Sequence, residues 1–190
     1  MIDSLNKLDT SLFLWLNGQH NTFFDPVMYW FSDKLIWIPM YLLIAFFIIR
    51  NYKKQGILIL IFVGIVILSC DQTASHLIKN AVLRLRPSHE PAVAGLIHLS
   101  KAGPGGLYGF ASSHAANVFG LALFLYFVLD NWFKWLKYWL FAWAFLVSYS
   151  RIYNGVHYPG DVIGGAAIGF FLGWAVAKLY LYIETKRLKT

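Results

Sequence analysis

The amino-acid sequence predicts an all-α integral membrane protein, a helical bundle of about five to six transmembrane helices with interfacial helices at its N-terminus. Of its 190 residues, 58% are hydrophobic and only 13% are charged, whereas about a quarter of the residues of a typical soluble domain are charged. Long apolar runs alternate with short polar connections, as expected for helices that cross a bilayer. No composition change marks a linker, so we expect one domain over residues 1–190.

The basic residues, which give a formal net charge of +7, lie at the ends of the apolar runs. A charge of this size can indicate nucleic-acid binding, but this placement is typical of membrane topology. We therefore expect the lipid bilayer as a partner and no nucleic acid. The single cysteine, Cys70, cannot form a disulfide within the chain.

Residues 1–33 are predicted to form short interfacial helices. Apolar side chains recur at helical spacing among polar ones, at Leu5, Leu8, Leu12, Trp15 and Leu16. Such a helix is amphipathic and too polar to span a membrane. Residues 22–32 are rich in aromatic side chains, which favour the headgroup boundary. This segment is a second interfacial helix or the entry to the first span, and a sixth span results if it inserts.

Residues 34–184 are predicted to form the transmembrane catalytic core. Five apolar runs supply its spans, at residues 35–49, 57–78, 115–129, 138–149 with their flanks, and 159–183. Residues 87–110 contain five glycines and three prolines without a helical period, which predicts a long loop. In the last span, small residues recur four apart, a spacing that lets helix backbones approach closely in lipid.

The positive charge also predicts an orientation. Residues 50–54, residues 130–137 and a basic tail at residues 185–190 alternate in phase with the spans, so they lie on one side. The positive-inside rule makes that side cytoplasmic. The opposite side, periplasmic for a bacterial inner membrane, receives the long loop and three polar clusters.

The first cluster runs from Lys79 to Pro87. On a helix, Lys79 and Arg86 would lie two turns apart on one face, and Pro87 would hold Arg86 extended and end the helix there. Arg84 lies off this face and is expected to contact lipid phosphate. Lys79 and Arg86 could also do no more than contact headgroups.

The second cluster, residues 109–114, opens the third span. Ser112 or Ser113 is a natural N-cap that leaves backbone N–H groups free, and such a helix end binds phosphate. His114 in the first turn could transfer a proton. The alternative is a capping motif with an incidental interfacial histidine.

The third cluster, residues 150–161, lies between two apolar runs. Pro159 suits the first turn of a helix, which places His157 just outside that helix and Asp161 in its first turn. Asp161 could then fix the tautomer of His157, while Arg151 offers a planar fork for an oxyanion. The alternative is a polar loop whose arginine contacts headgroups.

Together the clusters hold what phosphoryl transfer without a metal requires. His157 would attack phosphorus, Asp161 would orient its imidazole and His114 would protonate the leaving oxygen. The equatorial oxygens would be held by Lys79, Arg86, Ser112, Ser113 and Arg151. No group of candidate ligands has metal-site spacing, so we expect no metal and no cofactor.

These residues resemble the three signatures of the type 2 phosphatidic acid phosphatase superfamily. The family has Lys-x6-Arg-Pro, Pro-Ser-Gly-His and Ser-Arg-x5-His-x3-Asp, in that order. The chain has Lys79-x6-Arg86-Pro87, Ala111-Ser112-Ser113-His114 and Ser150-Arg151-x5-His157-x3-Asp161. The first and third match fully, whereas Ala111 and Ser113 replace the proline and glycine of the second. Serine still supplies a backbone N–H, and its Cβ would narrow the pocket.

The resemblance implies an all-helical membrane enzyme that dephosphorylates a lipid phosphate, without metal, through a phosphohistidine. It gives the residues above the same roles. The implied substrate is a membrane lipid monoester or pyrophosphate, among them undecaprenyl pyrophosphate, phosphatidic acid, phosphatidylglycerol phosphate and lipid A. Asp71 lies outside the signatures, and we expect it to pair with Lys79 or to position it, because a buried carboxylate needs a partner.

Two alternatives belong to other functional classes. A vanadium haloperoxidase would share the signatures, but those enzymes are soluble and the apolar spans argue against one. A non-catalytic lipid-binding or transport protein would not need the complete set of His114, His157 and Asp161. The sequence does not predict an oligomeric state.

Overall fold

The computed structural model describes residues 2–187, which form helices joined by loops. The helices of the bundle and its N-terminal cover are α1 (Ile2–Asn17), α2 (Phe24–Ser32), α3 (Ile38–Tyr52), α4 (Lys54–Gln72), α5 (Lys79–Val82), α6 (Ser113–Val128), α7 (Lys134–Tyr153) and α8 (Pro159–Arg187). Short helical turns are η1 (Leu35–Trp37), η2 (Thr73–Ile78), η3 (Pro87–His89) and η4 (Asn131–Phe133). The predicted all-α fold is confirmed.

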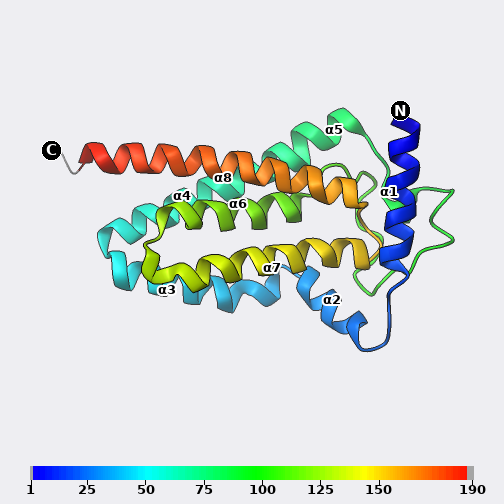
Figure 1. Ribbon diagram of the computed structural model, residues 1–190, viewed down its shortest axis with the longest axis horizontal. Coiled ribbons are helices and arrows are strands. Elements are labelled where there is room, and N and C mark those ends of the chain that lie inside the picture. The colour runs from blue at the N-terminus through cyan, green and yellow to red at the C-terminus, as the bar shows by residue number, and fades with distance from the viewer. Residues whose placement is uncertain (1, 188–190) are drawn as a thin grey trace.

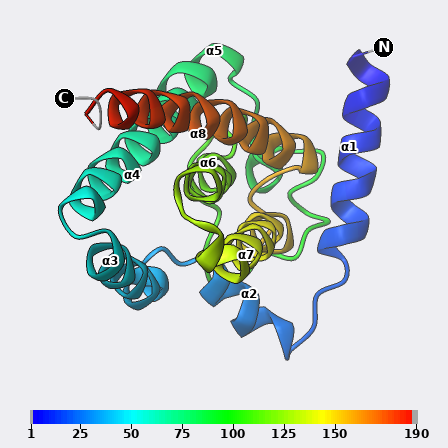
Figure 2. The same ribbon diagram turned by 60° about the vertical axis from the view of Figure 1, so that its left-hand side comes forward.

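α6 lies at the centre of the bundle, with α4, α7 and α8 around it (Figure 2). α8 packs on α6 through glycines, because a Cβ at Gly165, Gly169 or Gly173 would collide with the α6 backbone or its cap. The small residues predicted in the last span therefore do serve close helix packing.

Within residues 2–187, three helical stretches are long and apolar enough to cross a membrane: Leu35–Tyr52, Lys54–Val82 and Pro159–Arg187. α6 is apolar but shorter, and α7 completes the bundle beside it. Each predicted span coincides with one of the observed helical stretches. Four of these stretches are longer than the predicted span by a few residues at one or both ends, whereas the third predicted span ends one residue beyond α6. The number of helices that cross the membrane stays a prediction.

The connections α3–α4 and α6–α7 and the end of α8 lie at the same end of the bundle, as the charge pattern predicts (Figure 1). The Tyr52 hydroxyl accepts a hydrogen bond of 2.7 Å from the Asp130 backbone N–H, which joins the two connections. Of the predicted basic tail, Thr185 to Arg187 continue α8, and residues 188–190 lie outside the described residues.

The N-terminal segment covers the opposite end of the bundle, where α1 runs across the other helices (Figure 1). One face of α1 buries Phe13 and Asn17, while Leu5, Leu8 and Trp15 on the other are more than 60% exposed. α2 packs against α7. Helices are thus found where the sequence predicts them, and their interfacial position stays a prediction.

The predicted helix through Lys79 and Arg86 is wrong. After the wide turn η2, α5 ends at Val82, where Leu83 takes a left-handed conformation (φ +53°). The chain then pairs with the end of the long loop: the Arg86 N–H donates to Leu107 O, and the Gly109 N–H donates to Arg84 O. Arg86 is extended, as Pro87 requires. The helix ends before Arg86 because the pairing with residues 107–109 satisfies the backbone groups of residues 84–86.

Candidate active site

The turn between α7 and α8 holds the third sequence cluster in a fixed conformation. α7 ends at Tyr153, and the Asn154 side chain donates a 3.0 Å hydrogen bond to Met28 O on α2. Gly155 has φ +78°, which a residue with a side chain rarely adopts. The turn delivers His157 to the start of α8, and both His157 and Asp161 are almost completely buried.

His157 and Asp161 form the orienting pair that their spacing predicts. His157 Nδ1 lies 3.3 Å from Asp161 Oδ2, and the same oxygen accepts the Tyr158 backbone N–H at 3.0 Å. Because Nδ1 faces the carboxylate, Nε2 is the ring nitrogen left to act as a nucleophile. The two side chains thus form a buried pair in which the carboxylate fixes the orientation of the imidazole.

The imidazole of His157 is held neutral by its surroundings. Burial lowers the pKa of His157 well below its ordinary value, and the positive charges of Arg86, Arg151 and Lys79 lower it further. A neutral imidazole has a free lone pair, which is the state a nucleophile requires. The three cations that were predicted to bind phosphate all act on this one ring.

Arg86 reaches this site from the loop between α5 and α6. Its Nε donates a 3.0 Å hydrogen bond to Tyr108 O, and the chain passes so close at Gly105 that a Cβ there would collide with the guanidinium. Burial lowers the pKa of Arg86, and Asp161 opposes this shift. The long loop therefore fixes the arginine beside the buried carboxylate.

Arg151 approaches from the last turn of α7. Its Nη1 donates a hydrogen bond to Ser32 Oγ at the end of α2. Its Nε is buried and has no hydrogen-bond partner among the described residues. A buried donor without a partner is costly, so this N–H is a natural contact for an oxyanion.

The N-terminus of α6 supplies the second cluster. Ser112 is the N-cap: its Oγ accepts the Ala115 N–H at 3.4 Å, and its own N–H donates to Asp161 O at 2.9 Å. Ser113 begins the helix and His114 follows in the first turn, both half-buried. Burial lowers the pKa of His114 well below its ordinary value, and the positive charges of Arg151 and Lys34 lower it further. The negative charge of a bound phosphate would oppose this shift. The structure therefore gathers the second and third clusters at one place.

Lys79 is half-buried, and its positive charge lowers the pKa of His157. Its predicted partner, Asp71, bonds to another residue. Asp71 forms no ion pair with Lys79 within residues 2–187; its Oδ1 instead accepts a 3.4 Å hydrogen bond from Ser75 Oγ. Asp71 lines a neighbouring cavity, where it influences Lys79 only through its charge.

Arg84 also lies at this site, which the sequence interpretation did not predict. Instead of contacting headgroups, it bridges two carboxylates: Nη1 lies 2.9 Å from Asp161 Oδ1 and Nη2 lies 2.7 Å from Asp9 Oδ2. Its guanidinium also stacks 4.1 Å above the ring of Tyr158. In an extended segment, residues two apart point to the same side, so alternation with Arg86 is the signal that could have revealed it.

An apolar cavity of about 660 Å³ lies between α3, α4, α6 and α7. Along α6 its wall runs from His114 to Leu125, roughly 16 Å at the rise of an α-helix. Its charged or titratable lining residues are Asp33, Lys34, Tyr41, Asp71 and His114, and the other walls are mainly aliphatic and aromatic. The cavity thus joins the charged site to the apolar interior of the bundle.

Comparison with known proteins identifies the family. The family model of the PAP2 superfamily matches residues 56–184. The chain belongs to the PAP2 superfamily. All three signatures lie within the matched region, so the resemblance seen in the sequence is confirmed.

Two relatives match almost the whole chain. A lipid A 4′-phosphatase of Bacteroides thetaiotaomicron is 41% identical over 188 residues, covering 98% of this chain and 81% of the relative. A lipid A 4′-phosphatase of Porphyromonas gingivalis is 38% identical over 183 residues, covering 95% of this chain and 76% of the relative.

A solved structure shows the same fold. It is the transmembrane PAP2-type phosphatidylglycerolphosphate phosphatase from Bacillus subtilis, with a TM-score of 0.67 and 22% identity, covering 95% of this chain and 88% of that one. The protein is an integral membrane phosphatase of lipid phosphates, as predicted. The haloperoxidase and the non-catalytic alternatives are not favoured.

Proposed function

We propose that this chain removes the 4′-phosphate of lipid A at the periplasmic face of the bacterial inner membrane. The observation that supports this choice of substrate is the near full-length similarity to two lipid A 4′-phosphatases, at 41% and 38% identity. The charge pattern supports the location, because the site lies at the end of the bundle opposite the basic connections (Figure 1).

The first half of the reaction transfers the phosphoryl group to His157. Nε2 attacks phosphorus, the bond between phosphorus and the sugar oxygen breaks, and the leaving oxygen takes a proton from His114. Asp161 stabilises the imidazolium that forms, through its contact with Nδ1. The charge on the equatorial oxygens is shared by Lys79, Arg86 and Arg151 with the N–H groups at the start of α6.

The second half releases phosphate. Water attacks the phosphorus of the phosphohistidine, gives a proton to His114 and breaks the bond to Nε2. Inorganic phosphate leaves and His157 returns to its neutral state. His114 thus serves first as acid and then as base, so one residue suffices for both proton transfers.

The apolar cavity beside His114 supports a lipid substrate. A phosphate bound at the cations would place the rest of the molecule near the mouth of this cavity, whose lining is aliphatic and aromatic. An acyl chain of lipid A would bury its methylene groups there, and burial of each contributes about 0.8 kcal/mol.

A panel of lipids tests the proposal. Purified protein in detergent would be given lipid A, undecaprenyl pyrophosphate, phosphatidic acid and phosphatidylglycerol phosphate, and phosphate release would be followed. We expect kcat/KM for lipid A to exceed the others by about 10²-fold or more, with mass spectrometry locating the remaining phosphate at position 1. Faster turnover of another lipid, or loss of the 1-phosphate, would contradict the assignment.

A further inference from the structure

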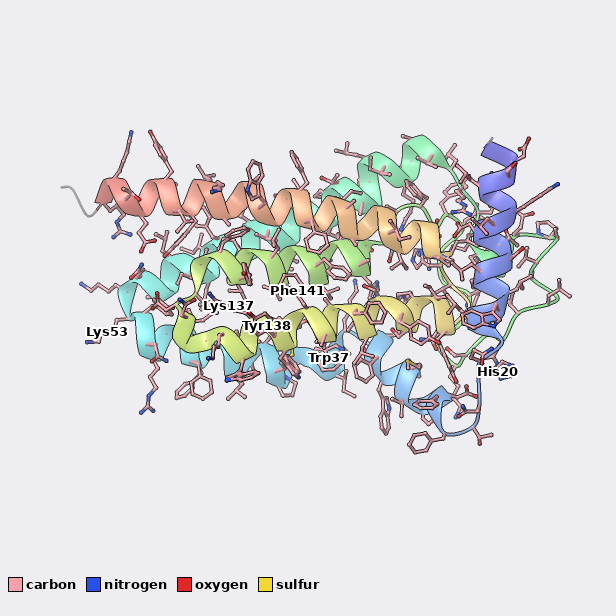
Figure 3. All side chains as sticks on the ribbon, viewed as in Figure 1. His20, Trp37, Lys53, Lys137, Tyr138 and Phe141 are labelled. Carbon is pink, nitrogen blue, oxygen red and sulfur yellow. The ribbon has the colours of Figure 1, made fainter. Side chains whose placement is uncertain are left out.

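A cluster of two histidines and one carboxylate lies outside the phosphatase site, where α1, α2 and the long loop meet. His20 follows α1, Asp25 lies in the first turn of α2, and His98 comes from the loop between α5 and α6. One potential ligand atom from each lies within 4.8 Å of the others. Figure 3 shows His20 at this end of the bundle, beside the end of α1.

His98 is held in position by a buried side chain. The Asn17 amide donates to His98 O at 2.9 Å and accepts the His98 backbone N–H at 2.7 Å. The same amide donates to Tyr153 O at 2.8 Å, so it joins the long loop to the end of α7. Asn17 is 2% exposed, and its bonds fix the backbone from which the His98 ring projects.

The carboxylate of the cluster is also supported from behind. The Tyr153 hydroxyl donates a 2.7 Å hydrogen bond to Asp25 Oδ1. Metal-binding carboxylates are commonly oriented by such a hydrogen bond from a neighbouring group. Both Asp25 and His98 thus receive support from the end of α7.

The His98 ring has a buried nitrogen with no hydrogen bond. Nε2 lies 3.2 Å from Asp25 Oδ1, but it forms no hydrogen bond with any described residue. The rings of His20 and His98 stack with their centroids 4.0 Å apart. Stacked rings hold their lone pairs in parallel planes, so the His20 ring must turn before both imidazoles can bind one cation. Such a cation would then satisfy the buried His98 nitrogen and the Asp25 carboxylate together.

We propose that His20, Asp25 and His98 bind a Zn²⁺ ion. Two imidazole nitrogens and one carboxylate oxygen form a donor set that suits Zn²⁺ rather than Ca²⁺ or Mg²⁺, which prefer oxygen ligands. Tetrahedral ligand atoms at about 2.0–2.1 Å from zinc lie about 3.3 Å from each other. His98 Nε2 and Asp25 Oδ1 lie 3.2 Å apart, which is close to this separation. His20 is exposed, so its ring can turn to bring its nitrogen to the ion.

The ion would stabilise the positions of segments next to the active site and would take no part in the reaction. It would join the α1–α2 connection, α2 and the long loop across the turn that follows α7. At that turn, His98 O lies so close to Gly155 that a Cβ there would collide with it, and His157 is two residues further on. The spacing rule used on the sequence could not detect this site, because 78 residues separate His20 from His98.

Zinc binding by the full chain tests this inference. The protein would be purified without a polyhistidine tag, stripped with EDTA and titrated with Zn²⁺ by calorimetry. We expect one ion per chain in the wild type and a loss of affinity of more than about tenfold in His20→Gln and His98→Gln. His76→Gln, which removes an exposed histidine outside the cluster, should bind as the wild type does.

Thermal unfolding gives a second measure that does not depend on turnover. Zn²⁺ should raise the unfolding midpoint of the wild type and of His76→Gln but not of His20→Gln, whereas Mg²⁺ should leave all three unchanged. Because His20 is exposed, its substitution should leave the fold intact. The proposal is overturned if the wild type binds no Zn²⁺, or if His20→Gln binds it as tightly. Neither result bears on the proposed phosphatase substrate.

Discussion

Asp161 is a fully buried carboxylate whose two oxygens are both engaged. Oδ2 faces His157 Nδ1 and accepts the Tyr158 N–H, while Oδ1 receives the guanidinium of Arg84. A buried charge without a partner is strongly destabilising. Arg84 therefore compensates the carboxylate that orients the proposed nucleophile and, through Asp9, ties it to α1.

Replacing Arg84 should impair both stability and turnover. In Arg84→Gln the Asp161 charge loses its ion pair, and we expect the free energy of unfolding to fall by about 2 kcal/mol. This is less than for a fully buried pair, because the Arg84 side chain is 23% exposed. We also expect kcat to fall about tenfold, since Asp161 no longer holds the His157 ring in one orientation. Denaturation in detergent and steady-state kinetics measure the two effects.

Asp161→Asn provides the matched background. If Arg84 acts by compensating the Asp161 charge, Arg84→Gln should cost less than about 1 kcal/mol once that charge has been removed. Equal costs of Arg84→Gln in the two backgrounds would show that Arg84 acts on something else.

The surroundings of His157 also predict how it titrates. Burial and three neighbouring cations lower its pKa, so its ring should stay neutral at pH values where an ordinary histidine, with a pKa of about 6.5, is half protonated. NMR of protein labelled in its histidine rings would measure this, with His157→Gln assigning the resonance. Titration of His157 at or above pH 6.5 would refute the proposed environment.

The same shift has a consequence for stability. Because the folded-state pKa lies below the unfolded one, the unfolded chain binds more protons between the two values. The contribution of His157 to the free energy of unfolding is thus complete above about pH 6.5. It decreases as the pH falls from there to the pKa of His157 in the folded protein.

Among the helices, α3, α4, α6 and α7 enclose the cavity assigned to the lipid. Gly64 on α4 lines it, and a Cβ at this position would have no neighbour within 4 Å. A larger side chain here would project into the cavity without displacing the helices, which makes Gly64 a suitable site for blocking it.

We expect Gly64→Phe to raise KM for a long-chain lipid phosphate roughly tenfold while leaving turnover of a chain-free phosphomonoester unchanged. The neighbouring Ile65→Phe is the control, because Ile65 is exposed and does not line the cavity. Equal effects of Gly64→Phe on both substrates, or no effect on either, would contradict the role assigned to the cavity.

The course of the chain at α5 shows where sequence reasoning stops. The apolar runs located α4 and α8, and Pro87 required Arg86 to be extended. Nothing local required the helix to end at Val82, because that end depends on pairing of residues 84–86 with residues 107–109. The Arg84–Asp161 contact follows from the same long-range pairing and was missed for the same reason.

Across the whole molecule, the order of the signatures and the phase of the spans predicted that His114, Arg151 and His157 lie at one end, and the structure places them there. The residues that hold Arg151 and Arg84 in place could not be predicted from the sequence. Arg151 donates a hydrogen bond to Ser32 of α2, and Arg84 pairs with Asp9 of α1. The packing of these two N-terminal helices on the bundle depends on contacts between residues far apart in the sequence.

The orientation of the bundle can be tested with single cysteines. In a Cys70→Ala background, Lys101→Cys places a thiol in the long loop and Lys54→Cys places one at the opposite end, both at exposed lysines. Figure 3 shows the neighbouring Lys53 at the end of the bundle far from His20. A membrane-impermeant thiol reagent added to intact spheroplasts should label Lys101→Cys and should label Lys54→Cys only after lysis. The reverse pattern would invert the topology.

The most direct test of the mechanism is to identify the residue that carries phosphate during turnover. The enzyme would be mixed with lipid A labelled with ³²P at the 4′-phosphate, quenched in alkali within the first turnover and digested. The account predicts label on the peptide that contains His157, stable in alkali, lost in mild acid and absent from His157→Gln. Turnover without labelled protein, or with label on another residue, would contradict it.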